Sequence, residues 1–318
     1  MHPVVKLIAQ RLALGLLLLW AASVLIFVGT EILPGDVAQN ILGQSATPQA
    51  LENLRAQLGL NEPPLTRYFS WFGGVLQGDL GTALSNGQDI ATSMGKRLGN
   101  TLFLAFWAAV VAVPLAIVLG IIAVRYRNRW PDKVISTFTL ATVSVPEFLL
   151  GYIAIFFLSV QVRWLPSLAT IHDGMSLGEK LQVIALPVLV LVLTVLGHMM
   201  RMTRAAILNV MESAYVETAE LKGLRPINII ARHALPNAIA PVVNVVMLNL
   251  AYLVVGVVVV EVVFVYPGMG QYLVDHVSKR DVPVVQACGL VFAAVYIGMN
   301  LIADVVSILA NPRLRHPK

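Results

Sequence analysis

The chain has 318 residues, of which 58% are hydrophobic and 12% are charged, and its mean hydropathy is +0.79. Soluble domains carry about 25% charged residues, so this composition excludes an ordinary water-exposed globule and favours lipid as the solvent. The formal net charge of +5 requires no nucleic-acid partner, because the topological bias of the basic residues accounts for it.

Six apolar stretches are long enough to cross a bilayer, which takes about 20 residues of helix. They are Leu12–Thr30, Leu98–Val124, Val134–Val162, Leu181–Met200, Ala234–Val260 and Val282–Ala303. None alternates apolar and polar residues as the strands of a membrane β-barrel do. The sequence therefore predicts an all-α integral membrane protein with six transmembrane helices.

The positions of the basic residues predict the topology. Of the 22 Lys and Arg, 14 fall on the side that holds both termini and 8 on the other side, where they are spread over a longer first loop. The positive-inside rule places both termini of this multi-pass membrane protein in the cytoplasm. Leu12–Thr30 is longer than the core of a signal peptide, so we expect a retained first helix.

Three regions follow from these spans: residues 1–32 with the first helix, an extracytoplasmic subdomain at 33–97, and a core at 98–318 that includes a cytoplasmic loop at 201–238. Within the subdomain, Ala46–Leu60 reads as an amphipathic helix with Thr47 as N-cap and Pro48 in its first position. Between the last two spans, a short helix is predicted around Gln271–Val277.

The cytoplasmic loop contains a polar stretch, Glu217–Asn237, between two apolar runs. Gly223 is suited to end one helix in the left-handed conformation, and Pro226 to begin another. The second helix places Ile227, Ile230 and Ala231 at a spacing of three to four residues, which predicts one apolar face. A helix of two turns is unstable alone, so this face packs either on the protein's own helix ends or in a groove of a partner.

The spacing of Glu217-Thr218-Ala219, Gly223 and His233-Ala234-Leu235-Pro236 resembles the EAA loop of bacterial ABC-importer permeases. Thr218 and His233 depart from the general pattern as the peptide/nickel branch does. Further strings resemble the first permease subunit of dipeptide, oligopeptide and nickel importers over nearly the whole chain. These are LPGD at Leu33–Asp36, LRAQLGL at Leu54–Leu60, QGDLGTAL at Gln77–Leu84, SVPEFLLG at Ser144–Gly151 and FVYPGMGQ at Phe264–Gln271.

The resemblance implies an ATP-driven importer of peptides or peptide-like solutes, nickel chelates included. Its other parts would be a second homologous permease, favoured as a heterodimer, two cytoplasmic ATPase subunits that bind ATP and Mg²⁺, and an extracytoplasmic substrate-binding protein. The binding protein would contact Ala46–Leu84 and Phe264–Val282. This chain would carry no cofactor and no catalysis. The residues implied in ATPase coupling are Glu217, Thr218, Ala219, Gly223, Ile227, Ile230, Ala231, His233, Leu235 and Pro236.

Three polar residues within the spans are candidates for the translocation pathway: Glu147, Asn244 and Asn249. Ionisable groups at membrane depth are costly and face protein or water, which favours a role in transport. The structural alternatives are a hydrogen bond that stabilises a kink beside Pro146 and interhelical amide hydrogen bonds. No histidine pairs with another ligand in a metal-binding pattern.

An alternative function is that of a secondary transporter driven by an ion gradient, for which Glu147 is the central carboxylate. It would not need the hinged cytoplasmic loop, and the hydropathy shows no inverted repeat. A membrane enzyme or channel is a further alternative, but neither a nucleophile–base set nor a Walker-type phosphate loop is present. The substrate and the choice between homodimer and heterodimer stay open at this point.

Overall fold

The computed structural model describes residues 3–32, 37–43, 46–57, 59–172 and 174–310. Over these residues the fold is built of helices, and one isolated antiparallel bridge joins Thr82 to Asp89. The motif at Leu33–Asp36, Leu58 and the basic residues after Ala310 lie outside the described residues. The predicted all-α class is confirmed.

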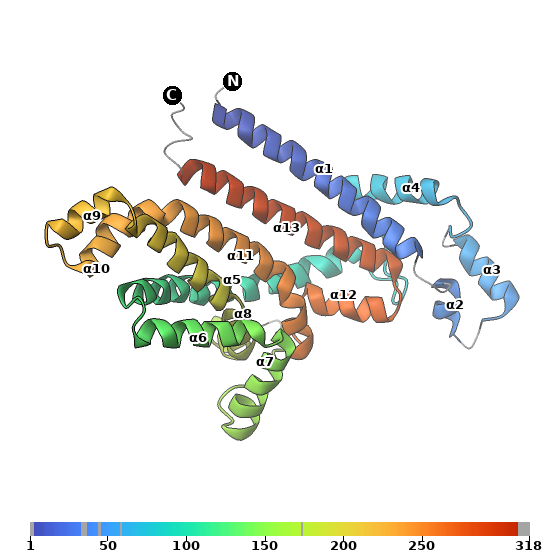
Figure 1. Cartoon of the computed structure of the whole chain (residues 1–318). Helices are drawn as coiled ribbons and strands as arrows, with labels where there is room; N and C mark the ends of the chain where they lie inside the picture. The colour runs from blue at the N-terminus through green and yellow to red at the C-terminus, as the bar shows by residue number, and fades with distance from the viewer. Residues whose placement is uncertain (1–2, 33–36, 44–45, 58, 173, 311–318) are drawn as a thin grey trace.

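The helices follow one another along the chain as Figure 1 labels them. Their bounds are α1 Pro3–Ile32, α2 Val37–Leu42, α3 Pro48–Gln57, α4 Pro64–Leu76, α5 Ile90–Arg125, α6 Trp130–Ser144, α7 Glu147–Ala154, α8 Leu177–Met211, α9 Ala214–Leu221, α10 Pro226–Ile229, α11 Leu235–Val263, α12 Met269–Ser278 and α13 Val282–Ala310. Two π-helical turns, Ile155–Gln161 and Ile230–Ala234, follow α7 and α10.

Four helices are long and apolar enough to cross a membrane: Lys6–Ile32, Ile90–Arg125, Leu177–Met211 and Val282–Val306. Two bent helix pairs pass the same test, so the described residues provide up to six spans. These pairs are Trp130–Ser144 with Glu147–Gln161, bent by 105°, and Pro226–Ile239 with Pro241–Val254, bent by 60°.

The third apolar run differs from the continuous helix predicted at Val134–Val162. Val145 is extended, with φ −93° and ψ 130°, and the helix breaks there. The cause is local, because Pro146 lacks an N–H and disfavours the helical conformation of the residue before it. Glu147 is therefore the first residue of α7 and does not lie in mid-helix. Figure 1 shows α7 and the turn after it projecting away from the other helices.

The core forms around α8, which contacts α5, α6, α7 and α11. Leu186, Leu196 and Met199 are among its fully buried residues. Gly197 allows close approach, since a Cβ there would meet the Thr139 carbonyl oxygen of α6 at 2.6 Å. Of the four long spans α8 is the most buried, with 61% of its most apolar segment inside the bundle, whereas α1, with 11%, packs mainly on α13 and stays peripheral.

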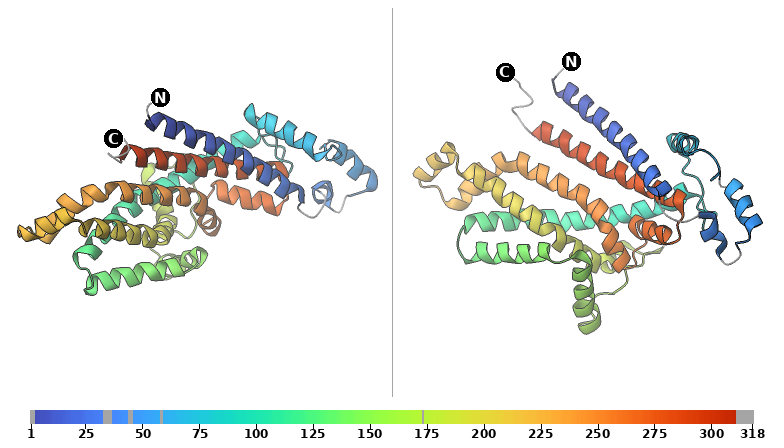
Figure 2. Two further views of the ribbon diagram at one scale, coloured as in Figure 1. Left: turned by 45° about the horizontal axis from the view of Figure 1, so that its top comes forward. Right: turned by 45° about the vertical axis from the view of Figure 1, so that its right-hand side comes forward.

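Both termini lie at the same end of the bundle as α9 and α10, and α2, α3, α4 and α12 lie at the opposite end (Figures 1 and 2). An ion pair of 3.0 Å between Arg11 and Asp304 joins α1 to α13 on the terminal side. The two ends of the molecule are thus distinct: one carries the loop between α8 and α11, and the other carries α2, α3, α4 and α12.

Two predicted short helices are confirmed at the end with α3 and α12. α3 starts at Pro48, and the Thr47 hydroxyl accepts a hydrogen bond from Ala50 N at 3.2 Å. Gly59, with φ +63°, follows α3 in the left-handed conformation. The helix predicted around Gln271–Val277 is α12.

Candidate functional site

The loop between α8 and α11 is built on a glycine turn. Gly223 has φ +72°, and its N–H donates to the Glu220 carbonyl at 2.9 Å. Leu224 N donates to the Ala219 carbonyl at 3.3 Å. These two bonds form the Schellman motif that ends a helix, and Pro226 then occupies the first position of α10. The predicted order of helix, glycine hinge and proline-initiated helix is confirmed.

The inner side of the loop is apolar and buried. Val216 and Ala219 of α9 pack with Ile229 of α10. The adjacent Ile230 packs in a second cluster with Ile207 of α8 and with Val124 at the end of α5. This packing holds α9 and α10 against each other and against the helix ends, so a force applied to the loop reaches α5 and α8 directly.

The outer side of the loop is also apolar, but it is exposed. Leu221 is 83% exposed and Ile227 is 45% exposed, and Tyr215 and Leu224 are exposed beside them. Soluble surfaces seldom gather large apolar side chains in this way unless a partner covers them. Of the two packing alternatives left open by the sequence, packing on the protein's own helix ends is confirmed for the inner side, and the outer side stays available to a partner.

The predicted face of Ile227, Ile230 and Ala231 is divided in the structure. Ile230 is buried, whereas Ile227 and Ala231 are exposed. The residues that pack inward here are Ile229, Ile230, Ala234 and Ala238, so the buried face is a neighbouring one that shares only Ile230 with the predicted face. The helix also continues through the π-helical turn Ile230–Ala234 into α11 and does not end before the membrane span.

The remaining coupling candidates lie around this turn. Glu217 and Thr218 are exposed on α9, and the Thr218 hydroxyl donates to the Ala214 carbonyl at 2.9 Å. His233 is half-buried in the π-helical turn. Leu235, also half-buried, and the exposed Pro236 lie in the first turn of α11, which follows the π-helical turn without a break.

A buried ion pair that the sequence did not reveal ties α8 to α6 near the loop. Arg204 Nε and Nη2 donate to the two carboxylate oxygens of Asp132 at 3.0 and 2.8 Å. Asp132 also accepts from Asn128 N at 2.9 Å and is 4% exposed. Because α9 follows α8 after two residues, this two-point contact links the loop to α6 and, through the break at Pro146, to α7.

Replacing Arg204 with lysine is expected to lower the free energy of unfolding by about 1.5–3 kcal/mol, because a lysine cannot make both parallel bonds to Asp132. The measurement is the thermal unfolding midpoint of the purified protein in detergent. Arg201→Lys, at an exposed position three residues earlier, is the matched control and is expected to leave the midpoint unchanged. Equal midpoints for both variants would show that the two parallel hydrogen bonds from Arg204 to Asp132 contribute nothing to stability.

At the opposite end of the bundle, a buried carboxyl group connects three helices. Glu261 of α11 is fully buried, and the Thr101 hydroxyl of α5 donates to it at 2.6 Å. Gly270 N and Gln271 N, in the first turn of α12, donate to it at 2.6 and 3.2 Å. A Cβ at Gly268 would overlap this carboxyl group. Glu261 was not predicted from the sequence as a functional residue, although an ionisable residue at the end of an apolar run was a usable signal.

A second carboxylate holds the connecting loop at this end. Asp281 is 1% exposed and accepts from Leu84 N and Ser85 N at 3.1 and 2.9 Å. These amides lie nearly 200 residues earlier, in the loop that leads into α5. Glu261 and Asp281 together fix α12 and the loop before α5 to the ends of the long helices.

The three pathway candidates are not gathered at one place. Asn249 donates to the Val245 carbonyl of its own helix at 2.8 Å. Asn244 is half-buried on the same helix, about 140° round the axis from Asn249 at 100° per residue. Glu147 lies on α7, one turn from Gly151, and Gly151 packs against Val263 of α11. Val263 is about 20 Å from Asn249 along α11, so Glu147 lies far from both asparagines.

Two family models match this chain. The model described as binding-protein-dependent transport system inner membrane component matches residues 112–316, and the model of the N-terminal part of such membrane components matches residues 4–105. The chain belongs to this family of transport proteins.

Curated relatives agree with the family. The glutathione transport system permease protein GsiC of Escherichia coli (strain K12) is 37% identical over 298 residues, covering 94% of this chain and 95% of the relative. The probable peptide ABC transporter permease protein y4tP of Sinorhizobium fredii is 32% identical over 309 residues, covering 97% and 99%. A solved structure titled as an inward-facing conformation of the MetNI methionine ABC transporter has a TM-score of 0.50 at 17% identity, covering 70% of this chain and 96% of that chain. It supports the fold alone.

The protein is therefore a membrane permease subunit of an ATP-driven ABC importer, and the secondary-transporter alternative is set aside. A permease subunit of this family is not an enzyme, and its ATPase is a separate subunit. It works with ATPase subunits and with a substrate-binding protein. Because the loop resembles the EAA loop of ABC-importer permeases, the exposed side of α9 and α10 is a candidate contact for the ATPase subunits.

Proposed function

We propose that this permease lines the translocation path for peptides or peptide-like solutes and pairs with a second, homologous permease as a heterodimer. The names of the relatives, which mention glutathione and peptides, support this substrate class. Nickel chelates are the second class to test. Uptake of labelled dipeptides, glutathione and a nickel chelate by the reconstituted complex discriminates among them. Six spans cross the membrane, both termini are cytoplasmic, and ATP and Mg²⁺ bind on the ATPase subunits.

The loop between α8 and α11 is the element that couples ATP hydrolysis to the membrane helices in this proposal. The observation that carries it is the pair of opposite apolar sides: Ile229 and Ile230 are buried against this chain, and Leu221 and Ile227 are exposed. A groove on each ATPase subunit grips the exposed side, in the helix-in-groove manner. Glu217 and Thr218 orient the loop in that groove, and His233, Leu235 and Pro236 join it to α11.

The pathway residues of the proposal are Glu147, Asn244 and Asn249. Glu147 stands at the bend of the third span, where a change in the angle between α6 and α7 would move it. The ion pair of Asp132 and Arg204 gives the loop a mechanical connection to that bend. The binding protein docks at the end that carries α3 and α12.

Gly223→Pro is expected to abolish the stimulation of ATPase activity by the binding protein. Proline fixes φ near −65°, whereas Gly223 has φ +72°, and it removes the N–H that donates to Glu220. The measurement is the ATPase rate of the full complex in lipid, with and without binding protein. Gly223→Asn is the matched control, because asparagine tolerates the left-handed conformation, and it retains the stimulation. Full stimulation of the proline variant would refute the coupling role of this turn.

A further inference from the structure

The helix α4, in the segment between the first two spans, has three distinct sides. At 100° per residue, Leu65, Phe69, Phe72 and Leu76 fall within about 60° of one another. Tyr68, Trp71 and Val75 form a second side, and Thr66, Arg67 and Ser70 form a third. An amphipathic helix with one apolar and one polar side meets two environments. The three sides of α4 differ in composition, so each suits a different environment.

The second side packs on α1. The Tyr68 hydroxyl lies 2.9 Å from Ser23 Oγ, which itself donates to the Trp20 carbonyl and so accepts from Tyr68. The ring of Phe27 lies 5.3 Å from Tyr68, edge to face, and 6.1 Å from Trp71. Ser23 and Phe27 both belong to the span Lys6–Ile32, so these contacts place α4 beside a membrane-spanning helix, in the half of it nearer Ile32.

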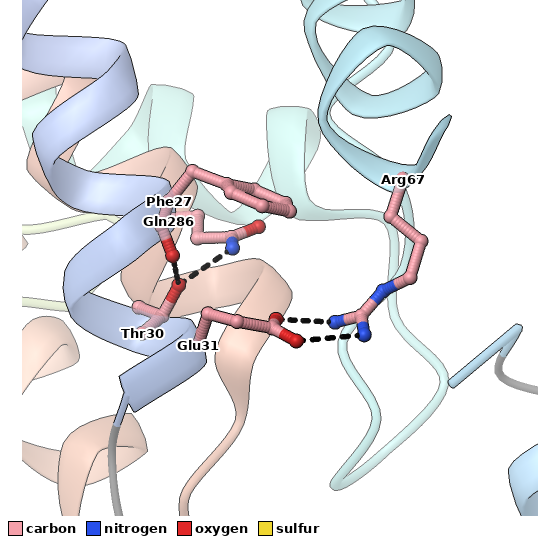
Figure 3. A network of polar contacts seen from close by, with 5 residues as sticks. All are labelled: Phe27, Thr30, Glu31, Arg67 and Gln286. Atoms are coloured by element: carbon pink, nitrogen blue, oxygen red, sulfur yellow. Dashed lines mark hydrogen bonds and ion pairs between the residues drawn. The ribbon is translucent and has the colours of Figure 1, made fainter. Parts of the chain in front are cut away.

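The third side is polar and meets the end of that span. Arg67 Nη1 and Nη2 donate to the two carboxylate oxygens of Glu31 at 3.1 and 2.7 Å, and both side chains keep contact with solvent (Figure 3). At the preceding residue of α1, the Thr30 hydroxyl accepts from Gln286 of α13 at 2.7 Å and donates to the Phe27 carbonyl. Glu31 lies one residue before the end of the span at Ile32. A charged pair at this position indicates the boundary between lipid and water.

The first side is largely uncovered in this chain: three of its four residues are exposed, and Phe72 is half-buried with its ring stacked on that of Tyr68. Leu65, Phe69 and Leu76 are 73%, 66% and 72% exposed. On α1, Leu25 and Ile32 are exposed as well, on the side of that helix opposite Ser23. In the right-hand view of Figure 2, α4 is seen nearly end-on, whereas α1 and α13 are seen along their length. The helix thus runs across the direction of the spans.

We propose that α4 is an interfacial helix that inserts the side formed by Leu65, Phe69, Phe72 and Leu76 into the acyl chains of the outer leaflet. A helix that lies across the spans at the level of Phe27 and Glu31 has lipid below, water above and α1 beside it, which matches its three sides one for one. This goes beyond the proposed function and removes one side of α4 from the surface available to the binding protein. Anchored in this way, α4 holds the segment before α5 at a fixed depth relative to the membrane.

The test uses the complete importer in nanodiscs of phosphatidylethanolamine and phosphatidylglycerol, with Cys288→Ala in this chain and cysteine-free partners. Nitroxide labels are attached at Phe69→Cys and Leu76→Cys, with Leu65→Cys as a reserve on the same side. Thr66→Cys and Ser70→Cys report the polar side, and Leu25→Cys in α1 is the lipid-exposed reference. Collision rates with oxygen, which partitions into lipid, and with a water-soluble nickel complex are measured at each label.

Insertion predicts that oxygen collisions exceed nickel collisions at Phe69 and Leu76, as at Leu25, and that the order reverses at Thr66 and Ser70. Adding the binding protein is expected to leave the rates at Phe69 and Leu76 unchanged. Nickel collisions in excess at Phe69 and Leu76 would place this side in water and overturn the proposal. Loss of both kinds of collision, in the complex alone or on adding binding protein, would show that a protein covers it and would overturn the proposal too.

Discussion

Leu221→Asp is expected to detach the ATPase subunits from this permease. The side chain is 83% exposed in the loop between α8 and α11, so its replacement leaves the fold intact and puts a charge into the ATPase groove that we propose for this loop. The central residues of protein interfaces are worth about 2 kcal/mol or more, which corresponds to roughly 30-fold weaker binding. The measurement is the amount of ATPase subunit that co-purifies with the permease, together with the ATPase rate of the reconstituted complex.

The matched control is Leu168→Asp, which introduces the same change at an exposed leucine near the other end of α11. The neighbouring Ala169 N donates to the Phe264 carbonyl just after that helix, so this leucine is remote from the coupling loop. The control is expected to retain its ATPase subunits. If both variants keep them in equal amount, the exposed apolar side of α9 and α10 is not the docking surface.

Glu261→Ala is expected to cause the largest loss of stability among single substitutions at the end of the bundle that carries α12. It leaves the Thr101 hydroxyl and the amides of Gly270 and Gln271 buried without their acceptor. Removing one partner of a buried charged contact costs about 3–5 kcal/mol. With a shift of about 2–4 °C per kcal/mol, the unfolding midpoint falls by on the order of 10 °C. Thermal unfolding in detergent measures this change.

Glu261→Gln is the conservative counterpart, because an amide keeps one acceptor oxygen for the two N–H groups and can donate to Thr101. It is expected to recover most of the lost stability. Gly268→Ala is expected to behave like Glu261→Ala, since its Cβ would overlap the carboxyl group. An unchanged midpoint for Glu261→Ala would show that this network does not hold α12. A glutamine variant as unstable as the alanine variant would show that charge, and not hydrogen-bond geometry, is what stabilises it.

Local chemistry determined much of this protein from the sequence alone. The length of the apolar runs set the membrane class, because a helix must satisfy its own backbone in lipid. Gly223 and Pro226 set the turn of the coupling loop, since one tolerates positive φ and the other starts helices. Thr47 set the start of α3. Each of these features depends on neighbours within a few positions.

Other features depend on residues far apart in the chain, and only the tertiary structure decided them. Ile230 points inward because Ile207 and Val124 pack there, whereas Leu221 meets no such neighbour. Glu261 finds its hydroxyl donor 160 residues earlier, and Asp132 finds Arg204 72 residues later. The spacing of apolar residues gives the faces of a helix, but which face is buried is decided by the elements that pack against it. For the same reason the three sides of α4 became interpretable only once Ser23, Phe27 and Glu31 of α1 stood beside it.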